Sequence, residues 1–156
     1  MIRHLTASAV VLDGRGQVLV VRHVLSRKWL YPGGHVENED PAHTAVRETH
    51  EETGLLVEVV AAPLFSHPAV TTHPPPVTIV EMGVRDAEFG EHRHIDMVYA
   101  CRPRAGTLAA QPGETTDVRW VPLDDIAGLD SPAELADLIQ HVTGWAGSLP
   151  SRTPSA

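Results

Sequence analysis

The chain has 156 residues, the size of one domain and enough to bury roughly two thirds of the surface that the unfolded chain exposes. Hydrophobic residues make up 42% and charged residues 21%, which excludes wholesale disorder and a fibrous repeat. The formal net charge is -8, a field that repels long phosphate backbones, so we expect no long nucleic acid as a partner. Nearly all basic side chains are arginines, whose guanidinium groups suit small phosphate-like anions.

The first forty residues predict short strands and turns. Two apolar runs, 7–12 and 17–22, flank the turn sequence Asp13-Gly14-Arg15-Gly16, and this pattern predicts a hairpin. Segment 29–36 contains Pro32-Gly33-Gly34, which predicts a loop or a bend in a strand.

The helix that follows has the clearest start and stop signals in the chain. Asp40 can cap its N-terminus, Pro41 occupies its first position and Gly54 ends it. The spacing therefore predicts a helix over 41–53.

Beyond this helix, hydrophobic patterning alternates with proline-rich and polar loops. Four prolines within 67–76 predict a stiff irregular loop, and 107–117 is polar. We expect strands at 55–65, 77–84, 95–101 and 118–121, and an amphipathic helix at 132–145. We predict a single domain over 1–145 and a flexible C-terminal tail over 146–156.

The predicted helix 41–53 carries a stripe of acid. At about 100° per residue, Glu48, Glu51 and Glu52 fall within an arc of about 100°, next to a separate arc of small residues. Like charges at this spacing destabilise a helix, so the stripe calls for a cation, and hard divalent metals prefer such oxygen ligands. A solvated acidic face beside Arg47 is the alternative, and the helical spacing by itself does not decide between them.

The wider sequence pattern favours a metal site over a solvated acidic face. The segment GGHVENEDPAHTAVRETHEETGL, which begins at Gly33, resembles the Nudix box of the Nudix hydrolase family. It matches every fixed position but one, with Gly33, Glu39, Arg47, Glu48, Glu51, Glu52, Gly54 and Leu55. Thr49 departs from the family's usual aliphatic residue; its volume is close to that of valine and it lies on the small-residue arc, so it affects packing and not chemistry.

The resemblance implies a fold and an activity. The fold would be α/β, a Nudix-type α/β/α sandwich with a mixed β-sheet. The activity would be metal-dependent hydrolysis of a nucleoside diphosphate linked to another moiety, with water attacking a pyrophosphate phosphorus. Because pyrophosphate and the glutamates are both anionic, Mg²⁺ or Mn²⁺ would bridge them.

The same resemblance assigns roles to residues of the box. The implied metal ligands are Glu48, Glu51 and Glu52, with the backbone of Gly33 as a further candidate. Arg47 would orient the carboxylates through charge-assisted hydrogen bonds and completes the expected catalytic set. The resemblance does not say which glutamate is the base.

Candidates outside the box are less specific. Glu114 is a possible further acid at the metal. In 92–96, alternation puts His92, His94 and Asp96 on one side of a strand, which fits substrate binding by His94 or Asp96, a zinc site that would need another ligand, or an ordinary polar face. His35, beside the double glycine, can reach a phosphate and is a third candidate for substrate binding.

Two rival functions stay open. A non-catalytic nucleotide-binding Nudix sensor would be marked by the loss of box glutamates, and none is lost. An isomerase of the isopentenyl diphosphate type is disfavoured by the short chain and the lack of a suitably placed cysteine. Among hydrolase substrates, nucleoside triphosphates, dinucleoside polyphosphates, ADP-ribose and nucleotide sugars are all compatible with the box.

The compartment is expected to be the cytoplasm. Cys101 is the only cysteine, so no internal disulfide can form, and no apolar run resembles a signal peptide or reaches the roughly 18 residues that span a bilayer. We therefore expect a small nucleotide-like diphosphate as the partner and no membrane contact; the oligomeric state is open.

Overall fold

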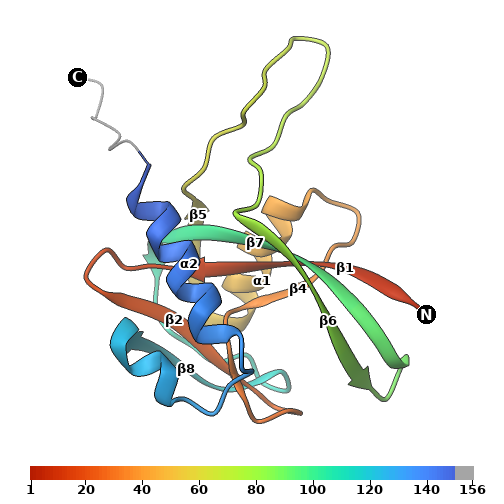
Figure 1. Ribbon diagram of the computed structural model, residues 1–156, viewed down its shortest axis with the longest axis vertical. Helices are drawn as coiled ribbons and strands as arrows, with labels where there is room; N and C mark the ends of the chain where they lie inside the picture. The colour runs from red at the N-terminus through yellow and green to blue at the C-terminus, as the bar shows by residue number, and fades with distance from the viewer. Residues whose placement is uncertain (150–156) are drawn as a thin grey trace.

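The computed structural model describes residues 1–149, which fold as two β-sheets with two α-helices and one 3-10 helix (Figure 1). The larger sheet contains β1 (Arg3–Val11), β4 (Gly33–His35), β5 (Leu55–Val59), β6 (Thr78–Asp86) and β7 (Gly90–Gly106). The smaller contains β2 (Gln17–His23), β3 (Trp29–Leu30) and β8 (Thr115–Pro122). The helices are α1 (Pro41–Thr53), η1 (Leu123–Gly128) and α2 (Leu135–Gly147).

The larger sheet is mixed and built around β7. Strand β1 runs parallel to β7 and lies between β7 and β4, which is antiparallel to β1. The other edge of β7 pairs antiparallel with β6 along its first half and with β5 along its second half. The β1–β4 pairing places Gly33 opposite Ser8, which brings the start of the Nudix-like segment to the edge of the sheet.

Alternation along β1 divides the core into two clusters, since successive side chains of a strand point to opposite faces. Ala7, Ala9 and Val11 pack in the cluster that contains Ala42 and Ala45 of α1. Val10 packs in the cluster that contains residues of α2, including Ile139. The larger sheet thus lies between α1 and α2, and the predicted α/β/α sandwich with a mixed sheet is confirmed.

The hairpin predicted over 7–22 is wrong, because its two strands belong to different sheets. Strand β1 pairs with β4 and β7, whereas β2 pairs with β3 and β8. Only one isolated bridge, Leu12 to Val18, closes the turn between them. The two runs bury residues on both faces, so each can form the centre of a sheet of its own.

Other element ends also differ from expectation. The strand predicted over 55–65 stops at Val59, and the one predicted over 95–101 extends over Gly90–Gly106. Strand β8 begins at Thr115, inside the segment expected to be a polar loop. Helix α2 continues through Gly147, past the start of the predicted tail, and residues 150–156 of that tail lie outside the described residues.

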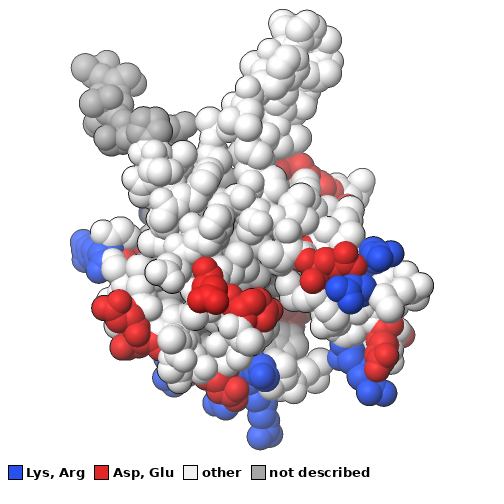
Figure 2. Space-filling model, viewed as in Figure 1, with Lys and Arg blue, Asp and Glu red and all other residues white. Residues whose placement is uncertain are grey.

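The segment between β5 and β6 projects from the body of the molecule as a long loop (Figure 1). Residues 60–77 contain no Lys, Arg, Asp or Glu, and Figure 2 shows the projection free of charged side chains. Leu64 and Phe65 are exposed on it. No helix or strand forms over 67–76, so the irregular loop predicted there is observed. Its His73 Nδ1 lies 3.5 Å from Asp40 Oδ1 at the start of α1.

Among residues 1–149, no helix combines the length and hydrophobicity that a membrane crossing requires.

Candidate active site

Helix α1 begins and ends as its sequence predicts. Asp40 has extended backbone angles, and its side chain accepts a hydrogen bond from the backbone N–H of His43 at 3.0 Å. Pro41 occupies the first turn, where its missing N–H costs nothing. Gly54 adopts a left-handed conformation with φ of 76°, which a residue with a Cβ rarely adopts. Both ends are thereby fixed relative to β4 and β5.

Glu52 lies almost completely inside the protein, with 5% of its surface exposed. Its Oε1 accepts a hydrogen bond from the backbone N–H of Gly33 at 3.0 Å. Burial raises the pKa of Glu52 to about 8; the Gly33 hydrogen bond opposes the rise, and the neighbouring carboxylates add to it. Without a cation, this side chain is therefore largely protonated at neutral pH.

Glu48 packs directly on the backbone of Gly34. A Cβ added to Gly34 would lie 2.3 Å from Glu48 Cδ, so no larger residue fits there without moving the carboxylate. Burial raises the pKa of Glu48, and the hydrogen bond from Arg47 opposes this effect. The two glycines at the start of the box thus each contact a different glutamate of α1.

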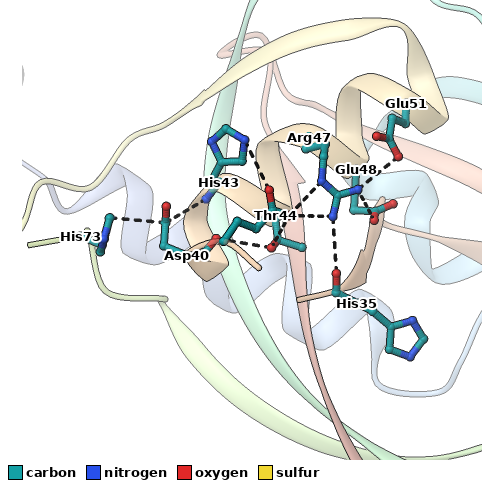
Figure 3. A network of polar contacts seen from close by, with 9 residues as sticks. His35, Asp40, His43, Thr44, Arg47, Glu48, Glu51 and His73 are labelled. Atoms are coloured by element: carbon teal, nitrogen blue, oxygen red, sulfur yellow. Dashed lines mark hydrogen bonds and ion pairs between the residues drawn. The ribbon is translucent and has the colours of Figure 1, made fainter. Parts of the chain in front are cut away.

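Arg47 is the centre of the polar network (Figure 3). Its Nε and Nη2 both donate to Glu39 Oε1, at 2.8 and 2.7 Å. Its Nη1 donates to Glu48 Oε1 at 2.8 Å and to Glu51 Oε2 at 3.2 Å. These hydrogen bonds hold the pKa of Glu39 below its usual range. Thr44 Oγ1 donates to the same Glu39 oxygen at 2.9 Å, so Glu39 anchors the guanidinium.

The network is short of positive charge. One guanidinium contacts three carboxylates, and it makes no hydrogen bond to Glu52. Glu114 lies close enough to raise the pKa values of Glu48 and Glu52 further. A buried carboxylate crowded by others is destabilised unless a cation joins it, and oxygen ligands of this kind suit a hard divalent metal.

The glutamates do not converge on a single point. Within residues 1–149, only one group of three histidine, cysteine or acidic side chains brings its ligand atoms within 4.8 Å of one another, and that group is His4, His92 and His94. Glu51 points outward beside Arg47, with 43% of its side chain exposed. Any cation held by the acidic stripe would therefore draw its ligands from carboxylates that now face Arg47 and Gly33.

Asp96 lies on β7 on the face of the sheet opposite α1. It is 3% exposed and accepts hydrogen bonds from Thr6 Oγ1 at 2.8 Å, Ser8 Oγ at 2.9 Å and Tyr31 Oη at 3.3 Å. Burial raises its pKa, and the three hydroxyl donors oppose the rise. Ser8 also touches the Gly33 backbone, where an added Cβ would lie 2.2 Å from Oγ. This buried polar cluster therefore adjoins the first residue of the box.

His35 and His94 lie together, on the same face of the larger sheet as Asp96. Their rings meet edge to face with centroids 5.0 Å apart, and both rings also contact His4. His35 belongs to β4, and its backbone oxygen is 3.5 Å from Arg47 Nη2. The three residues expected to bind substrate thus share one face of the larger sheet, with Asp96 bonded to hydroxyl groups and with His35 and His94 in a histidine cluster.

Sequence reasoning missed the partners that β1 supplies. Thr6 and Ser8 alternate with Ala7 and Ala9 in a strand that is otherwise apolar, and this alternation is a signal that polar side chains face one buried group. His4, two residues earlier on the same face, had no such signal. Its contact with β7 depends on parallel pairing between segments about ninety residues apart.

The comparison with known families agrees with this geometry. The model of the NUDIX domain matches residues 2–142, so the chain belongs to the Nudix family, and the predicted resemblance is confirmed.

Two curated relatives share part of their length with this chain. A probable DHNTP pyrophosphohydrolase of Lactococcus lactis subsp. cremoris (strain MG1363) is 31% identical over 102 residues, which are 61% of this chain and 51% of the relative. A human protein named nucleoside diphosphate-linked moiety X motif 6 is 28% identical over 141 residues, which are 87% of this chain and 39% of the relative. The chain spans about half the length, or less, of these relatives.

Solved structures share the fold over nearly the whole chain. A Nudix family hydrolase from Clostridium perfringens superposes with a TM-score of 0.72 at 20% identity, covering 93% of this chain and 99% of that one. A UDP-X diphosphatase superposes with a TM-score of 0.67 at 16% identity, covering 93% of this chain and 64% of that one. At these identities the likeness is one of fold.

Proposed function

We propose that this protein is a metal-dependent hydrolase of a nucleoside diphosphate linked to another moiety, in which water attacks a pyrophosphate phosphorus. The observation that carries the proposal is the position of Glu52 and Glu48 against Gly33 and Gly34. Acidic side chains on a solvated helix face would point to water. Here two carboxylates are turned inward onto the backbone at the edge of the sheet, and family membership and pyrophosphohydrolase-named relatives support the same reading.

The proposed metal is Mg²⁺ or Mn²⁺, with Glu48, Glu51 and Glu52 as ligands and the backbone of Gly33 and Glu114 as further candidates. When bound, such a metal supplies Lewis acidity toward phosphoryl oxygens and makes water more acidic. The chain's own contribution is to hold the carboxylates in place. Glu52 must give up the proton that burial favours, so cation binding and deprotonation of its carboxyl group are coupled.

Arg47 is the proposed orienting residue of the catalytic set. Its fork, fixed by Glu39 on one side, leaves Nη1 to restrain Glu48 and Glu51. A pre-organised pair of carboxylates needs less rearrangement when substrate arrives. Glu48, Glu51 and Glu52 are each retained as candidates for the base that takes the proton of the attacking water.

Substrate contacts are proposed on the two clusters beside β4. Asp96 is one candidate; because it is 3% exposed and already accepts three hydroxyl hydrogen bonds, a substrate donor would have to displace one of these partners. The roles of His35 and His94 in substrate binding stay predictions. The short single domain over 1–145 and a cytoplasmic location are likewise proposed from the sequence.

A substrate panel tests this function. The chain would be assayed with Mg²⁺ and with Mn²⁺ on nucleoside triphosphates, dinucleoside polyphosphates, ADP-ribose and nucleotide sugars, and both products would be identified. We expect cleavage within a pyrophosphate link, with turnover at least ~10²-fold lower in Glu52→Gln. Glu37→Gln, an exposed glutamate outside the network, is the matched control and should keep full turnover.

The sensor alternative gives a different result on the same panel. If folded wild type hydrolysed nothing while binding one nucleotide tightly, and Glu52→Gln left that binding unchanged, the chain would be a nucleotide-binding module and the hydrolase proposal would fail.

A further inference from the structure

Three histidines converge where β1 and β7 begin. The parallel pairing sets His4 beside His94, and His92 lies two residues earlier on the same face of β7. Their ligand atoms all lie within 4.8 Å of one another. Asp86, at the end of β6, adds a carboxylate whose Oδ2 is 3.5 Å from His92 Nε2. Ala7 and Ala9 of β1 face α1, so His4 and its neighbours lie on the other side of the sheet from the glutamates.

The hydrogen bonds of His92 fix which of its nitrogens carries a proton. Its Nδ1 is 3.1 Å from the backbone oxygen of Gly90, which can only accept, so Nδ1 carries the hydrogen. In the neutral ring Nε2 then presents a lone pair to Asp86 Oδ2 at 3.5 Å and to His94 Nε2 at 3.0 Å. A lone pair and a carboxylate that face each other repel, and either a proton on Nε2 or a metal cation between them relieves this repulsion. A ring that donates one nitrogen to a backbone carbonyl and offers the other is the usual arrangement of a metal-binding histidine.

The other two rings also bring nitrogen atoms to the cluster. His94 Nε2 lies 3.0 Å from His92 Nε2, so the two ring nitrogens face each other across the cluster. Among residues 1–149, buried His4 Nδ1 has no hydrogen-bond partner, a state that costs free energy in a folded protein. A cation bound among the three rings satisfies a lone pair of this kind.

Aromatic rings surround the cluster. Phe89, in the turn between β6 and β7, meets the His4 ring edge to face with centroids 4.5 Å apart. His35 closes another side against His4 and His94. His92 itself is 2% exposed, so its ring is enclosed within the cluster.

We propose that His4, His92 and His94, with Asp86 as the fourth ligand, form a binding site for a transition-metal dication of the zinc class. Imidazole nitrogens suit Zn²⁺, Co²⁺ or Ni²⁺ and not Mg²⁺, which prefers oxygen. In a tetrahedral zinc site, metal–nitrogen bonds of 2.0–2.1 Å put neighbouring ligand atoms about 3.3–3.4 Å apart. The separations of 3.0 Å from His92 to His94 and 3.5 Å from His92 to Asp86 lie on either side of that value.

The ligands come from β1, β6 and β7, so a bound metal would link these three strands at one end of the larger sheet. His35 packs on this cluster and belongs to β4, the strand that also carries Gly33 and Gly34. A bound metal would stabilise the edge of the sheet on which the box begins. It would do so without contacting the carboxylates of α1.

Metal titration of the untagged 156-residue chain tests the site. Zn²⁺ and Co²⁺ would be titrated calorimetrically in excess Mg²⁺, which keeps oxygen-preferring sites occupied. We expect one tight site, a rise in melting temperature with Zn²⁺, and a visible absorption spectrum of tetrahedral Co²⁺. His92→Asn should weaken Zn²⁺ binding more than ~10²-fold and Asp86→Asn by at least ~10-fold. His141→Asn, an exposed histidine on α2, is the matched control and should bind as wild type does.

Further variants and a crystal soak distinguish metal binding at the histidines from binding at the glutamates, and loss of the site from misfolding. Glu52→Gln should leave the tight Zn²⁺ site intact; loss of the site in Glu52→Gln but not in His92→Asn would overturn the proposal. If His92→Asn failed to fold, Asp86→Asn and His4→Asn would be used instead. An anomalous difference map from zinc-soaked crystals of the wild type should show a peak among the three imidazoles, and a peak only at the glutamates would refute it.

Discussion

The backbone N–H of Gly33 donates a 3.0 Å hydrogen bond to Glu52 Oε1, which joins the last turn of α1 to β4. Through this contact the two ends of the box meet, although nineteen positions separate the residues. Within residues 1–149, this N–H is the only hydrogen-bond donor to the Glu52 carboxyl group, which is otherwise buried. The free-energy cost of burying Glu52 therefore depends on whether its carboxyl group is ionised and on whether a cation binds beside it.

The first prediction concerns the stability of the metal-free protein between pH 5 and pH 8. Burial raises the pKa of Glu52 from 4.5 to about 8, so the folded state holds a proton that the unfolded state releases. The contribution of Glu52 to the free energy of unfolding is fully present below about pH 4.5 and is lost as pH rises through about 8. Between these values the free energy of unfolding falls by up to about 1.4 kcal/mol per pH unit. Denaturant unfolding across this range should show that slope in wild type.

Glu52→Gln removes the titrating group and should flatten this contribution, whereas Glu37→Gln should keep it. Saturating Mg²⁺ should also reduce the slope in wild type, because the metal binds the deprotonated form. An identical pH dependence in wild type and Glu52→Gln would mean that Glu52 titrates normally.

The second prediction is that Gly34→Ala displaces Glu48. The new Cβ would lie 2.3 Å from the Glu48 carboxyl carbon, so the side chain must move, at a cost of about 1–3 kcal/mol in stability. We expect kcat/KM to fall at least ~10-fold. Gly83→Ala, where no atom lies within 4 Å of the added Cβ, is the control and should be nearly neutral.

A second substitution distinguishes the steric effect of the added Cβ on stability from the loss of the Glu48 carboxylate for activity. Glu48→Ala added to Gly34→Ala should recover stability, since the obstructing carboxylate is gone, but should not recover activity. Equal stability of Gly34→Ala and wild type would show that Glu48 does not pack there.

The third prediction is that Arg47→Lys lowers turnover by ~10-fold or more. A lysine keeps the charge but cannot donate to Glu39 while it restrains Glu48 and Glu51, because it lacks the planar fork. Arg102→Lys, in an exposed pair with Glu58, is the matched control and should change stability by less than about 1 kcal/mol. Steady-state kinetics should show the Arg47 effect mainly in kcat; an effect on KM alone would contradict an orienting role.

The fourth prediction is that chelation abolishes turnover. The carboxylates of α1 repel one another and an anionic pyrophosphate, so substrate and site can meet only across a cation. Protein treated with EDTA should be inactive and should regain activity on addition of Mg²⁺ or Mn²⁺. Full activity in metal-free buffer would exclude the proposed mechanism.

The fifth prediction concerns the one position that departs from the Nudix pattern. Thr49 is fully buried on α1, and its hydroxyl donates to the backbone oxygen of Ala45 at 2.7 Å, an oxygen that the helix already uses. Thr49→Val should leave activity unchanged and the free energy of unfolding within about 1 kcal/mol of wild type. Thr49→Ala should cost more, because it opens a cavity; both values would come from denaturant melts.

The sequence by itself determined α1 and the chemistry of its acidic stripe. Asp40, Pro41 and Gly54 act through bonds to their own neighbourhood, so their effect can be read from local spacing. The 3.6-residue period likewise places Glu48, Glu51 and Glu52 on one side, and the box pattern identified the family.

Only the tertiary structure decided which side chains meet across strands. Whether β1 pairs with β2 or with β7 depends on contacts far apart in sequence, and turn chemistry at residues 13–16 favoured the wrong partner. The pairing with β7 then brings Thr6 and Ser8 to Asp96, and His4 to His94. The burial of Glu52, and with it the large rise in its pKa, likewise depends on the enclosure that α1 and β4 form together. Local propensity sets the elements, but strand partners and desolvation are properties of the assembled chain. The sequence could place His92 and His94 on one face, whereas their meeting with His4 could be found only in three dimensions.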